Sequence, residues 1–311
     1  MLSWQGYILK NYMLLKKRLS AQSHELDIPK SRADAEAMAR MFKPLDSIVC
    51  SPLVANTVPA EWILPPGAKA GQALLFLHGG YFNSGSIMSH RSLAGNIASA
   101  SQTRALIIDY RLTPEHPFPA ALDDTVAAYQ WLVDQDYPPH RLAVAGDSAG
   151  GTLAFSLLVH LRDKGMGLPA LAVALSPITD LTMSGDSWTT NAKKDLMIDP
   201  VKALKSVEIY LSEADARLPL ASPLFAGLEG LPPLLIQVGS NEMLLSDATR
   251  FTEKARKAGV DVELEVWEGM QHEWQFAASF LPEARQALKR IGEFVATRLT
   301  PRDLSPVSRK E

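Results

Sequence analysis

A serine stands at the apex of a glycine-flanked turn, in the segment Gly146 to Gly150. The apolar run Leu142 to Ala145 precedes this turn, and a helix-forming run from Thr152 to Arg162 follows it. Side chains two residues before and after a serine would collide in so tight a corner, which explains the two glycines. A helix that starts at the serine directs its unpaired N–H groups toward the reacting centre. The pattern is typical of a nucleophilic serine, here Ser148, that performs acyl transfer.

A serine hydroxyl is a weak nucleophile until a base removes its proton. In strand–turn–helix sites of this kind, the partners follow the serine along the chain in the order acid, then histidine. Of the seven histidines, only His272 follows the turn in a loop beyond the last expected strand, so we expect it to be the base. An acid should follow the strand at 234–238, where Glu242 and Asp247 are both candidates.

A glycine pair follows another buried strand, at 73–77. Gly79 and Gly80 allow the backbone there to come close to a bound group. In a serine hydrolase that group is the oxyanion of the substrate, which backbone N–H groups stabilise. We therefore expect this loop and the amide of Ala149, directly after the serine, to form an oxyanion hole.

The predicted elements alternate between strand and helix after residue 72. Strands are expected at 47–56, 58–64, 73–77, 103–110, 142–145, 169–175, 233–238 and 262–267, and helices at 1–20, 31–42 (capped by Ser31), 89–100, 120–134, 152–162, 199–212, 246–258 and 282–298. Such alternation predicts a mostly parallel sheet with helices on both faces. The segment 176–223 is too long for a simple connection, so we expect it to cover the active-site end of the sheet.

Several motifs, in this order and spacing, resemble the bacterial hormone-sensitive-lipase family of α/β-hydrolases. They are His78-Gly79-Gly80, Asp109-Tyr110-Arg111, Pro114 to Ala120, Gly146 to Gly151, and Met270-Gln271-His272. The likeness covers roughly residues 58–298. It implies an α/β-hydrolase fold with a helical cap, and a carboxylesterase acting on short- to medium-chain acyl esters. The cap would comprise residues 1–44 and 183–221, the catalytic core 45–182 and 222–300, and a flexible tail 301–311.

The chain departs from the family pattern at the acid. The family's first acidic position after the strand, usually aspartate, corresponds to Glu242, and its second falls on Ser246. Glutamate can also accept from the imidazole N–H and stabilise the imidazolium. We therefore expect a triad of Ser148, His272 and Glu242, with Asp247 as the alternative acid or a helix-start residue.

The chain also departs from the family in the loop that begins at His78, after the strand at 73–77, which we call the oxyanion loop. There Tyr81 replaces the third glycine of the family pattern. By likeness the donors map to Gly80 and Tyr81. A tyrosine adopts a positive φ only at a cost on the order of 1–2 kcal/mol, so Gly79 with Gly80 is the alternative pair. Three further residues are candidates for substrate contact: Phe82, Asp147 and Trp188.

Two other functions are compatible with these motifs. A histidine, two glycines and an aromatic pair also resemble the loop of arylformamidases, which hydrolyse N-formyl aromatic amides. A ligand receptor on an inactive hydrolase fold is less favoured, because all three triad positions hold competent residues. The sequence predicts no metal and no cofactor, since it contains neither an H-E-x-x-H motif, nor clustered cysteines and histidines, nor a G-x-G-x-x-G turn.

Composition narrows the partners of the chain. A formal charge of −3 over 311 residues does not favour nucleic acid, so a small-molecule ester is the expected partner. No apolar run is long enough to span a bilayer, and the N-terminus lacks a signal-peptide pattern. With a single cysteine, Cys50, the chain has no internal disulfide. We expect a cytoplasmic protein.

The first twenty residues form an amphipathic helix with a basic flank. Its apolar stripe comprises Trp4, Ile8, Tyr12, Leu15 and Leu19. Such a stripe packs against its own protein more often than against a membrane surface, so we favour packing. At the other end of the chain, the strand Val262 to Trp267 would lie at a sheet edge and would allow pairing across a homodimer.

Overall fold

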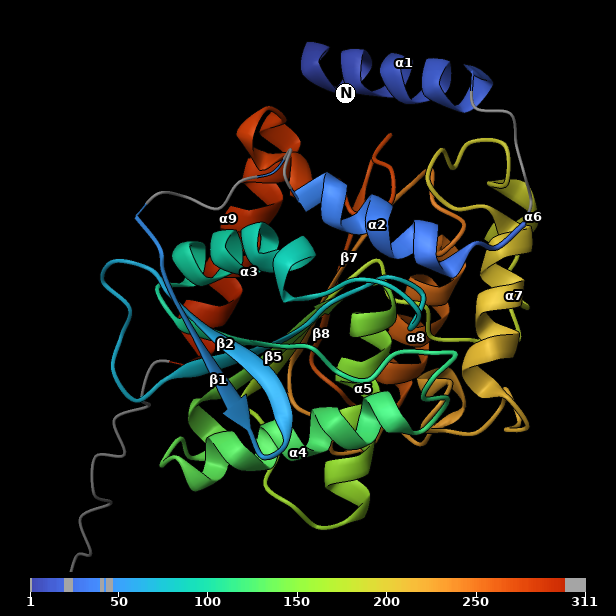
Figure 1. The fold of residues 1–311 in the computed structure, drawn as a ribbon. Coiled ribbons are helices and arrows are strands. Elements are labelled where there is room, and N and C mark those ends of the chain that lie inside the picture. Colours follow the sequence, from blue (N-terminus) through green and yellow to red (C-terminus); the bar gives the residue numbers. More distant parts are fainter. Residues whose placement is uncertain (1, 20–24, 40–41, 43–46, 300–311) are drawn as a thin grey trace, which may run out of the picture.

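An eight-stranded sheet runs through the centre of the computed structural model, which describes residues 2–19, 25–39, 42 and 47–299 (Figure 1). Its strands are β1 (Val49–Ala55), β2 (Val58–Leu64), β3 (Ala73–Leu77), β4 (Arg104–Ile108), β5 (Leu142–Asp147), β6 (Leu171–Leu175), β7 (Leu234–Gly239) and β8 (Val262–Trp267). They are ordered β1-β2-β4-β3-β5-β6-β7-β8. The first two pairings, β1 with β2 and β2 with β4, are antiparallel, and all others are parallel. The predicted mostly parallel sheet is confirmed.

Helices cover both faces of this sheet, as predicted. They are α1 (Trp4–Leu19), α2 (Ile28–Ala39), α3 (Ile87–Ser101), α4 (Ala120–Asp134), α5 (Ala149–Asp163), α6 (Ser187–Thr190), α7 (Pro200–Leu211), α8 (Leu245–Lys257) and α9 (Pro282–Leu299). Buried side chains of α3 and α9 form one hydrophobic core, and those of α4, α5, α7 and α8 form another. Figure 1 shows the sheet between these two groups of helices.

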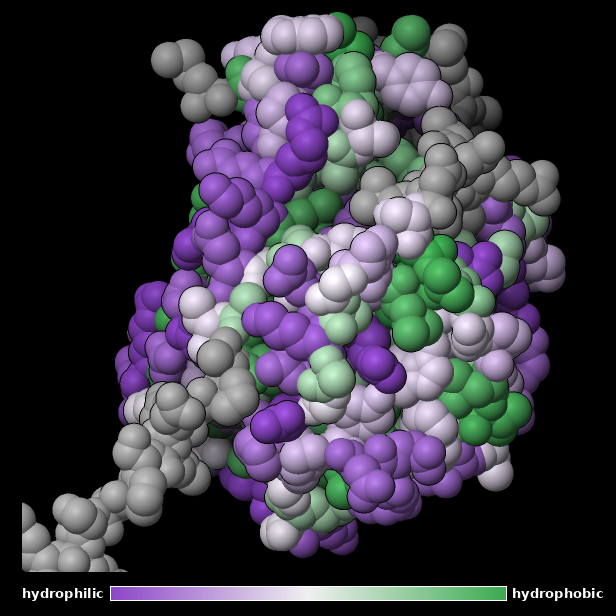
Figure 2. Space-filling view, turned by 90° about the vertical axis from the view of Figure 1, so that its left-hand side faces the viewer, coloured by the Kyte–Doolittle hydropathy of each residue, from purple (hydrophilic) through white to green (hydrophobic). Residues whose placement is uncertain are grey.

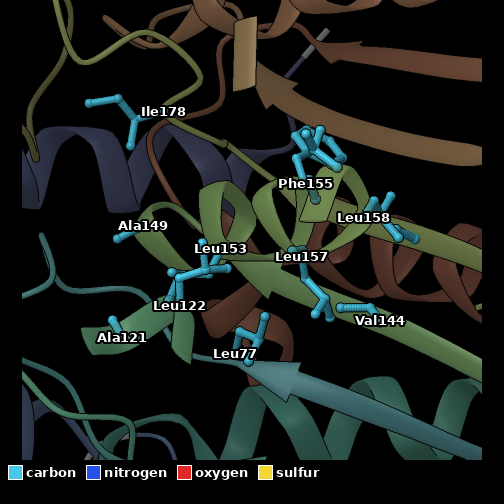
Figure 3. Close-up of a cluster of buried hydrophobic side chains, with 14 of the residues drawn as sticks. Leu77, Ala121, Leu122, Val144, Ala149, Leu153, Phe155, Leu157, Leu158 and Ile178 are labelled. Carbon is cyan, nitrogen blue, oxygen red and sulfur yellow. The ribbon is translucent and has the colours of Figure 1, made fainter. Parts of the chain in front are cut away.

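Each central strand contributes side chains alternately to the two hydrophobic cores. Leu75 and Leu77 of β3 belong to the core with α5, whereas Leu74 and Phe76 point to the core with α3. Successive side chains of a strand point to opposite faces, so a strand that is apolar throughout must be covered on both. Figure 3 shows the α5 side, where Leu77 lies beneath Leu153.

The cap residues differ from expectation at α2. This helix begins at Ile28, three residues before the expected cap Ser31. Asp27 Oδ1 accepts the amide hydrogen of Lys30 at 2.9 Å, so the aspartate occupies the capping place and Ser31 lies inside the helix. The expected tail 301–311 lies outside the described residues.

The apolar stripe of helix α1 faces outward, so the expectation that this stripe packs against the protein is wrong. Trp4 is 66% exposed and Tyr12 55%, and Ile8 and Leu15 are also more than half exposed. The side chain of Leu19 lies outside the described residues. The helix packs on the protein through other side chains, such as Leu9, and polar bonds hold it near its ends, where Ser3 donates to Glu283 and Lys17 Nζ donates to the carbonyl of Asp195. Figure 1 shows α1 at the periphery, away from the sheet.

The two sheet edges are β1 and β8, which places Val262 to Trp267 at an edge as predicted. Figure 2 shows the side of the molecule near β1, where apolar side chains form separate patches among polar ones. Within the described ranges, no helix combines the length and apolarity needed to cross a membrane.

Candidate active site

Ser148 occupies the turn between β5 and α5 in a strained backbone conformation, with φ 51° and ψ −118°. A Cβ atom added to Gly146 would lie 2.3 Å from the carbonyl oxygen of Gly150, and one added to Gly150 would lie 1.9 Å from that of Leu77. Only glycine fits at both positions, which is the steric rule that the sequence pattern expressed. The serine is buried, and its amide donates to the carbonyl of Leu175 at 2.7 Å.

His272 and Glu242 meet at the same end of the sheet. Glu242 follows β7, His272 follows β8, and these strands run parallel to β5, so the loops after them lie on one edge. Nδ1 of His272 lies 2.9 Å from Glu242 Oε2. The other carboxylate oxygen accepts from the hydroxyl of Ser176 and the amide of Gly239. These bonds orient the carboxylate toward the imidazole.

The electrostatic surroundings of His272 favour its charged form. Burial by itself would lower the pKa of His272, but the carboxylates of Glu273 and Glu242 outweigh burial and hold that pKa well above its usual value. The contact of His272 with Glu273 was not expected from the sequence. Glu273 Oε1 lies 3.4 Å from Nε2 of His272.

Asp247, the alternative acid, has other partners. Its Oδ1 accepts from the amides of Thr179 and Asp180, each at 3.0 Å, and its Oδ2 accepts the indole N–H of Trp188 at 3.1 Å. Burial, together with the charge of Asp180, raises the pKa of Asp247 to about 7. This carboxyl therefore anchors the segment after β6 and is not hydrogen-bonded to His272.

The backbone amides of the oxyanion loop differ in whether they already have a hydrogen-bond acceptor. The amide of Gly79, one of the expected oxyanion donors, donates instead to Asp147 Oδ2 at 2.9 Å. Gly80 has φ 112° and Tyr81 φ 55°, so the tyrosine adopts the left-handed backbone. Among the described residues, no hydrogen bond is formed by the amides of Gly80, Tyr81 or Ala149.

Asp147 also differs from its expected role. It is fully buried beneath the loop, bonded to the amide of Gly79 and to Nε2 of His90 at 3.1 Å. It therefore supports the loop and is not among the residues that line the cavity in front of Ser148. Phe82 and Trp188, by contrast, border a cavity. Phe82 also stacks on Tyr210 of α7, with ring centroids 3.7 Å apart.

This cavity lies directly in front of the serine. Its volume is about 10 Å³, which is roughly the least space that holds one water molecule. Most of the wall is apolar and comes from the oxyanion loop, the serine turn and the segment 176–223. The lining residues are Tyr81, Phe82, Ser148, Ala149, Ile178, Trp188, Ile198, Val207 and Leu244.

Three supporting residues were not indicated by the sequence. They are Ser176, which bonds to Glu242; His90, which bonds to Asp147; and Glu273, which faces His272. Ser176 follows β6 at the edge that also carries the other site residues, so its place among parallel strands was a usable signal. Glu273 directly follows His272 in the sequence, but no pattern there indicates where its carboxylate points.

Comparisons with known proteins agree with this geometry. A family model described as alpha/beta hydrolase fold matches residues 74–276. An acetyl-hydrolase of Streptomyces hygroscopicus is 46% identical over 238 residues, which is 76% of this chain and 79% of that protein. An esterase of Acinetobacter venetianus is 35% identical over 297 residues, covering 94% of this chain and 97% of its own.

Solved structures show the same relationship. A crystal structure of an esterase from the bacterial hormone-sensitive lipase family is 44% identical, with a TM-score of 0.91 over 96% of this chain and 100% of that one. The crystal structure of a hormone-sensitive lipase from a metagenome library is 35% identical, with a TM-score of 0.91 over 95% of this chain and 98% of its own. The chain belongs to the bacterial hormone-sensitive-lipase family of α/β-hydrolases and is, by homology, a carboxylesterase.

Proposed function

We propose that this esterase hydrolyses short- to medium-chain acyl esters through Ser148, His272 and Glu242. The contact of 2.9 Å between Nδ1 of His272 and Glu242 Oε2 carries the proposal, because it is the orientation that a base for a serine requires. The strained turn at Ser148 supports it from the other side.

The mechanism is a two-step acyl transfer. Ser148 attacks the ester carbonyl while Nε2 of His272 takes its proton, and Glu242 holds the imidazole in the required tautomer. The hydrogen bond between Ser148 and His272 forms as the substrate binds, since such bonds tighten in the Michaelis complex. His272 then protonates the leaving alcohol, and water activated by the same imidazole hydrolyses the acyl-enzyme.

The oxyanion is stabilised by the amides of Gly80, Tyr81 and Ala149. The amide of Gly79 is excluded because it donates to Asp147. Removal of one such donor costs about 3–4 kcal/mol in other serine hydrolases. The positive φ of Tyr81 keeps the loop in the conformation that glycine would otherwise supply.

The cavity favours the short end of the acyl range. It is narrow and apolar, and Trp188 and Ile198 close it from the segment 176–223. Two relatives support small acyl groups by their names, an acetyl-hydrolase and an ethyl acetate hydrolase of Pseudomonas putida, which is 32% identical. We propose acetyl and butyryl esters as the best substrates.

The segments 1–44 and 183–221 are proposed to form the cap. Helix α2 in the first segment contacts the oxyanion loop and the loop between β4 and α4, because Arg32 donates to the carbonyls of Asn83 and Thr113, each at 2.9 Å. The second segment supplies Trp188 and Ile198 to the cavity wall. Of these two segments, only the second lines the cavity within the described residues.

The test is hydrolysis of p-nitrophenyl acetate, butyrate, octanoate and palmitate by the wild type and by Ser148→Ala. We expect kcat/KM to be highest for acetate or butyrate and to be lost in the variant. Activity that survives Ser148→Ala would contradict the proposal. A rate on N-formylkynurenine far above those on the esters would favour an arylformamidase instead.

A second candidate function, hydrolysis at an anionic lipid surface, is favoured by the exposed stripe of α1. Trp4, Tyr12 and Leu15 face outward on a helix that contains basic residues but no acidic ones. Aromatic and aliphatic side chains beside lysines suit the boundary between lipid headgroups and acyl chains. The positive charge also opposes pairing of two such helices.

Sedimentation with vesicles tests this second candidate. We expect the wild type to sediment with phosphatidylglycerol vesicles but not with phosphatidylcholine vesicles, and the double variant Trp4→Ser, Tyr12→Ser to lose binding. The matched control is Val49→Ser with Val54→Ser, which removes two equally exposed apolar side chains from β1. Equal sedimentation of all three proteins would argue against a role for α1.

A further inference from the structure

His272 lies between two carboxylates, one at each ring nitrogen. Glu242 Oε2 is 2.9 Å from Nδ1, and Glu273 Oε1 is 3.4 Å from Nε2. Nε2 is the nitrogen that must accept the proton of Ser148 in the proposed mechanism. Among the described residues, however, no hydrogen bond joins Ser148 to His272. The carboxylate of Glu273 therefore lies beside the ring nitrogen that the serine must reach.

The position of Glu273 is constrained by its backbone and by its neighbours. Its φ of 57° and ψ of 35° lie in the left-handed region, which is uncommon for glutamate. Its side chain is only 13% exposed. A Cβ atom added to Gly79 would lie 2.8 Å from Glu273 Oε1 and 2.3 Å from Asp147 Oδ2, so both carboxyls occupy the space beside this glycine. Residue 79 must lack a side chain for Glu273 to reach His272.

The charges around Glu273 leave it ionised. It faces His272 of its own loop, Asp147 at the end of β5 and His90 of α3, and the neutral phenols of Tyr81 and Tyr110 are also near. Two adjacent buried carboxyls do not both ionise readily. Burial raises the pKa of Asp147 to about 6, against the opposing effect of His90. Burial also disfavours ionised Glu273, but His272 outweighs it and lowers the pKa of Glu273 to about 2.

We propose that Glu273 is a positioning carboxylate that holds His272 as an imidazolium in the free enzyme, and so sets the pH above which His272 can act as the base. This proposal rests on the function proposed for His272. A negative charge beside Nε2 stabilises the proton there, and that proton must leave before the imidazole can accept one from Ser148.

Glu273→Gln tests the proposal, because glutamine keeps the shape and removes the charge. The acidic limb of the pH profile of kcat/KM reports the free enzyme, and we expect its midpoint to move to lower pH by about one unit. At pH values below the midpoints of both proteins, kcat/KM of the variant should then be about tenfold higher than that of the wild type. Glu268→Gln is the matched control, since Glu268 lies in the same loop. Glu273→Asp should return the limb toward the wild-type position.

A second measurement keeps the proposal independent of ester hydrolysis. NMR titration of labelled His272 in the Ser148→Ala background should show a lower imidazole pKa when Glu273 is replaced by Gln. An unchanged His272 pKa and an unchanged limb in a folded Glu273→Gln enzyme would overturn the proposal. A loss of kcat without movement of the limb would also overturn it, because that result indicates a purely structural role. If the NMR shift appears but Ser148→Ala keeps full activity, the proposed function fails and the effect of Glu273 on His272 stands.

Discussion

Trp188 donates its indole N–H to Asp247 at 3.1 Å, and this bond connects the segment after β6 to the start of α8. The same carboxyl also accepts from the backbone of Thr179 and Asp180. A group with three donors from one segment is an anchor for that segment. The two carboxyls between which the sequence left a choice, Glu242 and Asp247, therefore have separate tasks, and their variants should fail in different ways.

Glu242→Ala should impair catalysis far more than folding. Without the carboxylate, the imidazole loses both its orientation and the charge that stabilises the imidazolium, and kcat should fall by about 10⁴-fold. The measurement is kcat/KM on p-nitrophenyl acetate, with the melting temperature measured on the same samples. A wild-type rate in Glu242→Ala would remove this residue from the triad.

Asp247→Ala should instead impair stability. It leaves the amides of Thr179 and Asp180 and the indole of Trp188 without their acceptor in a buried place, at about 1–3 kcal/mol for each unsatisfied group. We expect a lower urea midpoint for unfolding and a kcat within a few-fold of wild type for the folded fraction. The assignment is wrong if Asp247→Ala loses activity as completely as Glu242→Ala while its midpoint is unchanged.

The parts of the site that the sequence predicted depend on local rules. Gly146 and Gly150 flank Ser148 because a turn this tight excludes side chains, and that restriction is visible in the spacing alone. His272 was identified by chain order. The central strands were recognisable as short apolar runs, because each of them is buried on both faces.

The unpredicted parts arise where distant segments meet. The amide of Gly79 is unavailable because Asp147, which lies far along the chain, accepts from it. The sequence around each residue indicates only a loop at Gly79 and a turn at Asp147. Nothing in either pattern predicts that the two residues form a hydrogen bond. The exposure of the apolar stripe of α1 was not predicted either, although the stripe itself is visible in the sequence. Periodicity identifies an apolar face, but whether a partner covers it depends on how the helix is held at Ser3 and Lys17.

Ile198→Ala should shift the substrate preference toward longer acyl chains. Ile198 is buried in the wall of the cavity in front of Ser148, and its truncation makes room for additional methylene groups. One methylene in an apolar pocket changes kcat/KM by about 10–200-fold, so we expect the ratio of octanoate to acetate hydrolysis to rise by at least about tenfold.

Leu204→Ala is the control for this shift. Leu204 belongs to the same segment but is 49% exposed on α7, away from the cavity lining. Its truncation should leave the chain-length profile unchanged. If Ile198→Ala and Leu204→Ala give the same profile, then the cavity is not the acyl site.

The pH dependence of the wild type should reflect the two carboxylates beside His272. They hold the proton on the imidazole, so its pKa lies above the ordinary value of about 6.5, and the neutral form needed for catalysis is lost as the pH falls through this raised value. We therefore expect kcat/KM on p-nitrophenyl acetate to rise with pH and to reach its plateau only in the alkaline range. Rates measured in buffers of constant ionic strength, with the spontaneous hydrolysis subtracted, give the midpoint of the limb. A midpoint at or below the ordinary histidine value would mean that burial outweighs the carboxylates at this site.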